Sequence, residues 1–292
     1  MHPHPSEINT DPGEIAAFAL FLHDLPGIGV ATANRLLRHF KTYAYLKRYP
    51  QEQILVRLEK LPHARRTVKA LLDTEEASRR LENARKEVQA LAQKKIEILT
   101  PLHANYPSNW QSLPESQRPY MLLAFGHLEI LNRKKTGFFA HPPLSSPVFE
   151  AAQSLMQEAL HEHQTLISDL KHGFDVVLHK RASASPTGAS IALLDCGFSY
   201  LPPPMRPHAM TLVRRGGLLL SPYPIQQPPA PYQSYRRIAL QMSLADALVF
   251  LEPQPEKPYW KSFLQALEQP KPTTVLGNAP VELPTSIRHF SL

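Results

Sequence analysis

The sequence contains a single cysteine, Cys196, among its 292 residues. One cysteine excludes a disulfide within the chain and a metal cluster held by several thiolates. The sequence also has no run of about 18 apolar residues, which excludes a membrane-spanning helix. Cys196 itself stands at the end of an apolar stretch and is predicted to be a core residue.

The N-terminal residues Met1–Pro5 lack the basic and apolar pattern of a secretory signal, so a soluble cytoplasmic protein is expected. Hydrophobic residues make up 43% of the chain, enough for one large domain or two smaller ones. The 32 Lys and Arg residues exceed the 25 Asp and Glu residues, giving a formal net charge of +7. This balance favours a polyanionic partner.

The first third of the chain is predicted to be helical. Asp11 and Pro12 have the pattern of a helix start, with Asp11 as the N-cap and Pro12 at the first helical position. Residues 50–95 are predicted to form two more amphipathic helices, the last from about Thr74 to Lys95. Opposite charges four residues apart indicate a solvated face on that last helix, at Glu75–Arg79, Glu76–Arg80 and Glu82–Lys86.

The segment Leu25-Pro26-Gly27-Ile28-Gly29 separates two of these helices and is typical of a helix-hairpin-helix. Gly27 and Gly29 permit a tight turn whose backbone N–H groups can meet a nucleic-acid phosphate. Arg35 follows on the second helix and is a candidate for contact with the DNA backbone. The alternative is a hairpin that only packs or docks.

After about residue 96, continuous apolar strands alternate with helices, which predicts a parallel sheet covered on both faces. Strands are predicted at Gly137–Ala140, Gln164–Ser168, Ser190–Asp195, Gly217–Ser221, Ala247–Glu252 and Thr273–Leu276. Helices are predicted at Pro147–Glu162, His172–Ala182, Pro207–Arg214, Tyr232–Leu244 and Trp260–Glu268.

The stretch Ser168–Ala182 is predicted to carry the binding site of this sheet. It joins a strand to a helix through Gly173, a junction where free N–H groups and the positive end of a helix dipole meet. In an open α/β sheet this junction lies at the carboxyl ends of the strands, where ligands bind. Lys171 and His172 in the turn are therefore candidate phosphate contacts, with a solvated turn as the alternative.

The order of motifs along the chain resembles that of the DprA/Smf family of DNA-processing proteins. The family's L-P-G-I-G hairpin, I-L-T-x5-Y-P leader, S-G-L-A-x-G-I-D-x3-H block and F-P-x-R-N-R-I-I-A-G-L-S helix all have counterparts here in the same order. The matching segments are Leu25–Gly29, Ile98–Pro107, Pro119–Gly126, Ser168–His179, Ser190–Phe198, Gly217–Pro224 and Tyr232–Ser243.

Several positions depart from the family pattern. The family's G-S-R turn is replaced by His141–Ser146, in which Pro142 and Pro143 have no N–H donor. Asp169 stands where the S-G-L-A block has its glycine and places a negative charge where phosphate would approach. The family's S-G-S-L-x-T-A turn is replaced at residues 256–260, and the chain ends near Leu292 without the winged-helix domain of many members.

The candidate DNA contacts are a set of glycine and basic residues: Lys171, His172, Gly173, Lys180, Arg181, Arg236 and Arg237. The alternative for Arg237 is a carboxylate held across the sheet, and the alternative for Lys180 and Arg181 is surface solubility. Tyr232 and Tyr235 are either packed at the start of a helix or stacked on bases.

Asp175 and His179, four residues apart on one helix, are predicted to form a structural pair. Read as catalysis, the pair would be an acid–base couple, but nothing supplies a nucleophile or metal beside it. We therefore predict no enzyme activity, no catalytic residue, no cofactor and no metal site.

The predicted fold is a small all-α helix-hairpin-helix (SAM-like) domain over residues 1–95, followed by an extended Rossmann-like domain over residues 96–292. The predicted function is that of a protein that binds single-stranded DNA, protects it and assists loading of the RecA recombinase in natural transformation. Homodimerisation is a further expectation from the resemblance. The alternative is a protein-interaction or nucleotide-sensing role with a remodelled phosphate pocket; a nucleotide-cleaving enzyme would need a P-G-G-x-G-T pattern that is missing here.

Overall fold

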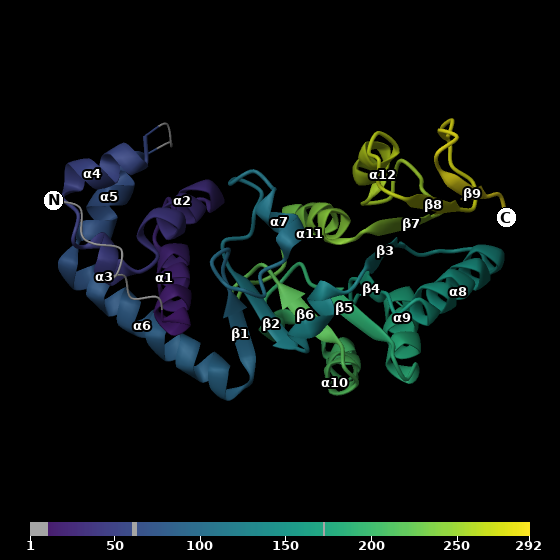
Figure 1. Cartoon of the computed structure of the whole chain (residues 1–292), viewed down its shortest axis with the longest axis horizontal. Coiled ribbons are helices and arrows are strands. Elements are labelled where there is room, and N and C mark those ends of the chain that lie inside the picture. The colour runs from purple at the N-terminus through teal and green to yellow at the C-terminus, as the bar shows by residue number, and fades with distance from the viewer. Residues whose placement is uncertain (1–10, 60–62, 172) are drawn as a thin grey trace. The chain divides into compact units, whose positions relative to one another are not determined.

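The computed structural model in Figure 1 describes residues 11–59, 63–171 and 173–292. The chain divides into two compact units, one ending at Leu123 and the other running from Ala124 to Leu292. The domain boundary at residues 95 and 96 remains a proposal. No helix in the described residues is long and apolar enough to cross a membrane.

The first unit is built mainly from helices around an apolar core that includes Phe18, Phe21 and Leu36. The predicted start of the first helix is confirmed, because the Asp11 carboxylate accepts the Gly13 N–H at 3.0 Å. Its elements are α1 (Pro12–Asp24), α2 (Val30–Phe40), α3 (Tyr43–Leu46), α4 (Gln51–Arg57), α5 (Ala64–Leu72), α6 (Thr74–Gln93), β1 (Ile96–Leu99) and α7 (Ser108–Gln111).

The prediction of two helices over residues 50–95 is wrong, because the described parts of this range contain α4, α5 and α6. Asp73 ends α5 and caps α6 by accepting the Glu76 N–H, which starts a new helix directly after the old one. On α6 the predicted Glu76–Arg80 and Glu82–Lys86 pairs are present. Arg79 pairs with Glu76 at 2.7 Å in place of the predicted Glu75.

The second unit holds the predicted parallel sheet. Its strands are β3 (Lys135–Phe139), β4 (Thr165–Ser168), β5 (Ala189–Leu193), β6 (Leu218–Ser221), β7 (Ala247–Leu251), β8 (Thr273–Leu276) and β9 (Arg288–Phe290). They lie in the order β6-β5-β4-β3-β7-β8-β9, and every described pairing among them is parallel. A further strand, β2 (Leu122–Gly126), contains the division between the units. Because the chain leaves β3 in one direction and returns at β7 on the other side, the order switches beside β3.

Helices cover both faces of this sheet, as predicted. Figure 1 shows α8 (Ser146–His161), α9 (Gly173–Ala184) and α10 (Arg206–Arg214) on one side of the strands, and α11 (Pro231–Leu244) and α12 (Trp260–Leu267) on the other. Successive side chains of β3 point to opposite faces of the sheet. Phe138 belongs to the core under α8 and α9, whereas Phe139 stacks on Phe250, which packs against Phe263 of α12.

The predicted strands and helices of this unit are confirmed to within two residues at each end. The Pro-rich segment after Pro270 contains β8 and adds β9 beside it, with Val275 opposite His289.

Candidate nucleic-acid interface

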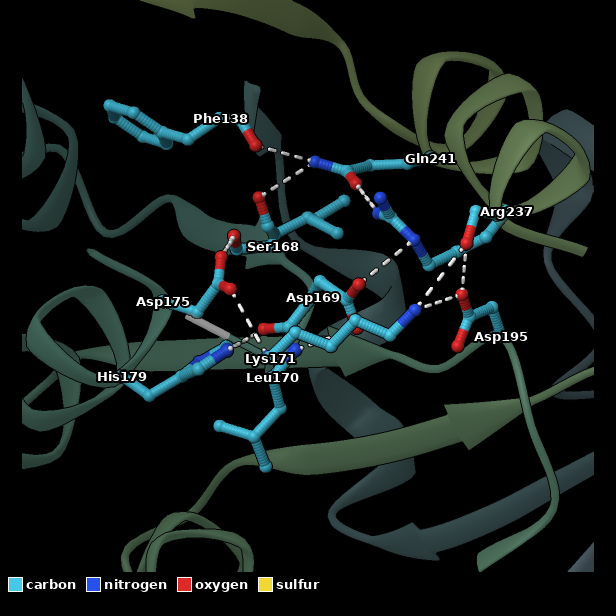
Figure 2. Close-up of polar contacts among 12 residues, drawn as sticks. Phe138, Ser168, Asp169, Leu170, Lys171, Asp175, His179, Asp195, Arg237 and Gln241 are labelled. Carbon is cyan, nitrogen blue, oxygen red and sulfur yellow. Dashed lines mark hydrogen bonds and ion pairs between the residues drawn. The ribbon is translucent and has the colours of Figure 1, made fainter. Parts of the chain in front are cut away.

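The turn between β4 and α9 donates its N–H groups to carboxylates of the chain itself. The Leu170 N–H donates to Asp169 Oδ1 at 2.8 Å, and the Lys171 N–H donates to Asp175 Oδ2 at 3.2 Å. The Ser168 hydroxyl hydrogen-bonds to the same Asp175 carboxylate, as Figure 2 shows. Asp175 lies in the first turn of α9, where a negative charge is favoured by the helix dipole.

Lys171 forms an ion pair with Asp195, which follows β5. The Lys171 ammonium also lies 3.4 Å from the Ser234 hydroxyl, and Ser234 itself hydrogen-bonds to Asp195. Burial alone would raise the pKa of Asp195, but the hydrogen bonds from Lys171 and Ser234 outweigh it and lower that pKa. Asp195 is therefore a carboxylate at neutral pH, and it neutralises the lysine predicted to meet phosphate.

Arg237 forms a second ion pair, with Asp169. Its Nε lies 3.3 Å from Asp169 Oδ2, outside hydrogen-bond geometry, so the contact is electrostatic. The Arg237 Nη1 donates to Gln241 Oε1 at 2.6 Å, and the Gln241 amide donates to the carbonyls of Phe138 and Ile167 (Figure 2). Gln241 thus ties α11 to the ends of β3 and β4 and orients the guanidinium. Of the two alternatives for Arg237, contact with phosphate or with a carboxylate across the sheet, the structure shows the contact with a carboxylate, that of Asp169.

Asp169 is the carboxyl of this cluster that resists ionisation. Burial raises its pKa to about 6, in spite of the opposing effect of Arg237. The neighbouring carboxylates of Asp175 and Asp195 raise this pKa further, while Lys171 lowers it. At neutral pH the pair with Arg237 is formed, and it is lost as the pH falls through about 6.

His179 is held by partners other than the predicted one. Its Nε2 lies 2.8 Å from the Asp169 carbonyl, and its Nδ1 lies 2.9 Å from the Ser190 hydroxyl. A carbonyl only accepts, so the ring proton is on Nε2 and Nδ1 accepts from Ser190. Burial lowers the pKa of His179, which keeps the ring neutral. Both ring nitrogens bond partners other than Asp175, and the nearby Asp175 charge acts on the ring electrostatically.

Asp169, Lys171, Asp175 and Arg237 line a pocket of about 240 Å³ at the carboxyl ends of β3 and β4. One wall is apolar and includes Phe139, Ile238 and Tyr259, and the other is formed by the charged cluster. The pocket lies beside the position where the strand order switches, as expected for a ligand site in an open α/β sheet.

The turn at residues 141–146, which replaces the family's G-S-R pattern, contacts side chains of the chain through both carbonyl and N–H groups. The Lys257 ammonium donates to the His141 carbonyl at 2.7 Å, and the Ser145 N–H donates to the Glu252 carboxylate at 3.2 Å. A side-chain cation and a side-chain anion of the chain therefore occupy this turn. Sequence reasoning missed Lys257 and Glu252.

The other predicted DNA contacts lie in different environments. The guanidinium of Arg236 is 5.7 Å from the centroid of the Tyr223 ring, outside the pocket lining. Gly173 is exposed, and nothing lies within 4 Å of a Cβ built on it. His172 lies outside the described residues. Lys180 and Arg181 line a second, open hollow of about 800 Å³ near the carboxyl ends of α8 and α9.

Two tyrosines that the sequence left open, and one predicted core residue, now have definite places. Tyr232 and Tyr235 are 62% and 58% exposed, which contradicts the packed alternative at the start of α11. Their rings project because the buried positions of this helix begin at Gln233 and continue at Ile238. Cys196 is buried, as predicted, and burial raises the pKa of its thiol to about 11.

In the first unit the hairpin glycines form the predicted turn, with Gly27 at φ +83° and Gly29 preceding α2. Arg35 is held within this unit by Glu115, with its Nη2 3.0 Å from the carboxylate, and it also donates to the Glu59 carbonyl at 3.0 Å. Arg38 binds the other oxygen of Glu115 at 2.8 Å. The described residues hold no group of three or more His, Cys, Asp or Glu side chains that could bind a metal ion.

A parallel sheet covered on both faces, with a pocket at the carboxyl ends of its strands, defines a Rossmann-like fold. Residues 97–281 match the family of DNA recombination-mediator protein A, and the chain belongs to this family of DNA-processing proteins of recombination.

The chain is similar to Protein Smf of Escherichia coli K12, with 35% identity over 91 residues. That segment is 30% of this chain and only 24% of the length of Protein Smf. The fold is similar to the X-ray structure of DNA processing protein A (DprA) from Streptococcus pneumoniae, with a TM-score of 0.71 and 15% identity over 96% of this chain and 94% of that one.

A second solved structure, of DNA processing protein A from Helicobacter pylori, has a TM-score of 0.54 and 19% identity. The match covers 65% of this chain and 84% of that one. The Helicobacter pylori protein is described as having a unique single-stranded DNA binding mode.

Proposed function

We propose that this chain binds single-stranded DNA across the carboxyl edge of its second unit and passes it to a RecA recombinase. The observation that carries the proposal is that Lys171 and Arg237 line the pocket at that edge, in a member of a DNA-processing family. Arg236 lies beside Tyr223, just after the end of β6. Exposed tyrosines on α11 add surfaces on which unpaired bases stack.

In this proposal the partly exposed Lys171 and Arg236 contact the DNA backbone directly, and Gly173 lets the strand approach the turn. His172, between Lys171 and Gly173 in the sequence, is proposed as a further contact. Lys180 and Arg181 extend the basic surface along α9, and the hairpin of Gly27, Gly29 and Arg35 supplies a second contact in the first unit. No catalytic step is part of this function.

The test is fluorescence anisotropy with single- and double-stranded oligonucleotides over a salt series, using wild type, Lys171→Ala and Arg236→Ala. Each lost phosphate contact reduces the salt slope by about one, so both variants should bind single strands more weakly and with a flatter slope. Lys94→Ala, which removes a charge from the exposed end of α6, is the matched control and should bind like wild type. Absence of single-strand binding by wild type at low salt would refute the proposal.

RecA loading and dimer formation are tested separately. We expect the protein to speed RecA filament assembly on single-stranded DNA that is already coated with a single-strand-binding protein. We also expect it to sediment as a dimer, at twice the chain mass of 33.0 kDa. Unchanged filament assembly would refute the proposal that RecA is a partner, without affecting the proposal of DNA binding.

One observation favours a second candidate function, the protein-interaction or nucleotide-sensing role. Lys171 and Arg237 are each paired with a carboxylate of the chain, which reduces the positive charge available to DNA. If this role is the correct one, oligonucleotides will not bind, whereas a mononucleotide or a protein partner will.

A further inference from the structure

We propose that Asp169 is an internal anion that holds the place of a phosphate in the pocket and so sets the affinity of this pocket for anions. For free anions this inference stands alone; for DNA it rests on the function proposed above. The S-G-L-A pattern of the family has a glycine at this point, so the acidic side chain is a departure of this chain from that pattern.

The contacts of Asp169 are those that a bound phosphate would make. One carboxylate oxygen accepts the Leu170 N–H at 2.8 Å, and the other faces the Arg237 guanidinium at 3.3 Å. A turn N–H and a guanidinium are the two kinds of donor that proteins use for phosphate. A second anion at this point would displace the carboxylate or be repelled by it.

The charge of the whole cluster opposes a second anion. Asp169, Asp175 and Asp195 face Lys171 and Arg237, so the ionised cluster carries a net charge of −1 with His179 neutral. Asp175 and Asp195 each accept additional hydrogen bonds, from Ser168 and Ser234 respectively. The site disfavours the charge of Asp169, because burial raises its pKa to about 6.

Removal of this one charge leaves the remaining site intact. Arg237 stays oriented by Gln241, and the amide oxygen introduced by Asp169→Asn can still accept the Leu170 N–H. The guanidinium then lacks a counter-ion and faces a pocket of about 240 Å³. We therefore expect Asp169→Asn to gain affinity for anions.

The experiment measures binding of sulfate, whose charge is constant over the pH range used, by calorimetry on the full chain. Asp169→Asn should bind sulfate at least about tenfold more tightly than wild type at neutral pH. The matched control is Glu129→Gln, which removes one negative charge from a side chain that is 67% exposed in the short helix before β3. Equal sulfate affinity of Asp169→Asn and wild type would overturn the proposal, as would an equal gain in the control.

The pH dependence provides a second readout. Around Asp169 the titratable and charged groups are Arg237 of α11, Asp175 and His179 of α9, Lys171 of the turn, Asp195 after β5 and His141 on the pocket rim. Sulfate affinity of wild type should rise as the pH falls from about 8 to about 5, because Asp169 becomes protonated, and this rise should be smaller in Asp169→Asn. Parallel curves for the two proteins would contradict the role of Asp169.

Single-stranded oligonucleotides then separate the inference from the proposed function. A gain in both sulfate and DNA affinity, with a salt slope steeper by about one, supports both. A gain for sulfate with no DNA binding by any variant refutes the proposed function and leaves the phosphate-mimicking role of Asp169 in place. A gain for sulfate without a gain in existing DNA binding overturns the part of the inference that concerns DNA.

Discussion

Asp169 links the charge of the pocket to the stability of the fold. Its pKa is raised in the folded protein from 3.8 to about 6, so between these values the folded state binds more protons than the unfolded state. The stabilising effect of the protonated carboxyl is complete below the unfolded value and is lost as the pH rises through about 6.

We predict that Asp169→Asn changes this pH dependence. Relative to the variant, the free energy of unfolding of wild type should fall by up to about 3 kcal/mol between acidic and neutral pH. Urea denaturation at several pH values measures it. The prediction fails if the difference between the two proteins is the same at pH values near 4 and near 7.

Arg35 is a proposed DNA contact whose bonds within the first unit also predict a contribution to stability. Its guanidinium is about three-quarters buried and bonds Glu115 and the Glu59 carbonyl. Arg35→Ala should therefore lower the free energy of unfolding by about 1–3 kcal/mol. Thermal denaturation gives the result, and Arg65→Ala, at an exposed arginine of α5, is the comparison. An unchanged melting temperature would show that the Glu115 contact contributes nothing.

At the scale of elements, two glycines next to strands of the same sheet are expected to differ. A Cβ on Gly197 would clash with the carbonyl oxygens of Pro224 and Ile225, so Gly197→Ala should destabilise the protein by about 3 kcal/mol. Gly173 starts α9 in open space without positive φ, so Gly173→Ala should be neutral or stabilising by up to about 1 kcal/mol.

The same pair tests the proposed approach of DNA to the turn. If a phosphate approaches the Gly173 backbone, Gly173→Ala weakens single-strand binding without lowering stability. Stability comes from chemical denaturation and affinity from anisotropy. A Gly197→Ala variant as stable as wild type would show that the close approach of the two loops is not required.

The elements of the second unit were predictable because its strands are continuous apolar runs between turns. Residues of β4 and β5 are all buried, which is the condition that produces such runs. β9 was missed because Arg288–Phe290 is short and largely exposed, and its pairing with β8 depends on the tail folding back. The break between α5 and α6 depends on one capping residue, Asp73.

The site was predictable only in part. Arg236 and Arg237 were both predicted as DNA contacts, but Arg237 lines the pocket with Ser234, Ile238 and Gln241 on one face of α11, and Arg236 lies outside the lining. The pairing of Lys171 with Asp195 was not predictable, because it joins the ends of two strands that meet only in the folded sheet.

At the scale of the whole molecule, single-stranded DNA is proposed to lie across the carboxyl edge of the second unit. Photocross-linking of a 5-iodouracil oligonucleotide to the full chain, followed by identification of the modified peptides, measures this directly. We expect cross-links at the exposed Tyr232 and Tyr235 and at His141 on the pocket rim. Cross-links confined to the first unit, or none under conditions where the strand is bound, would contradict it.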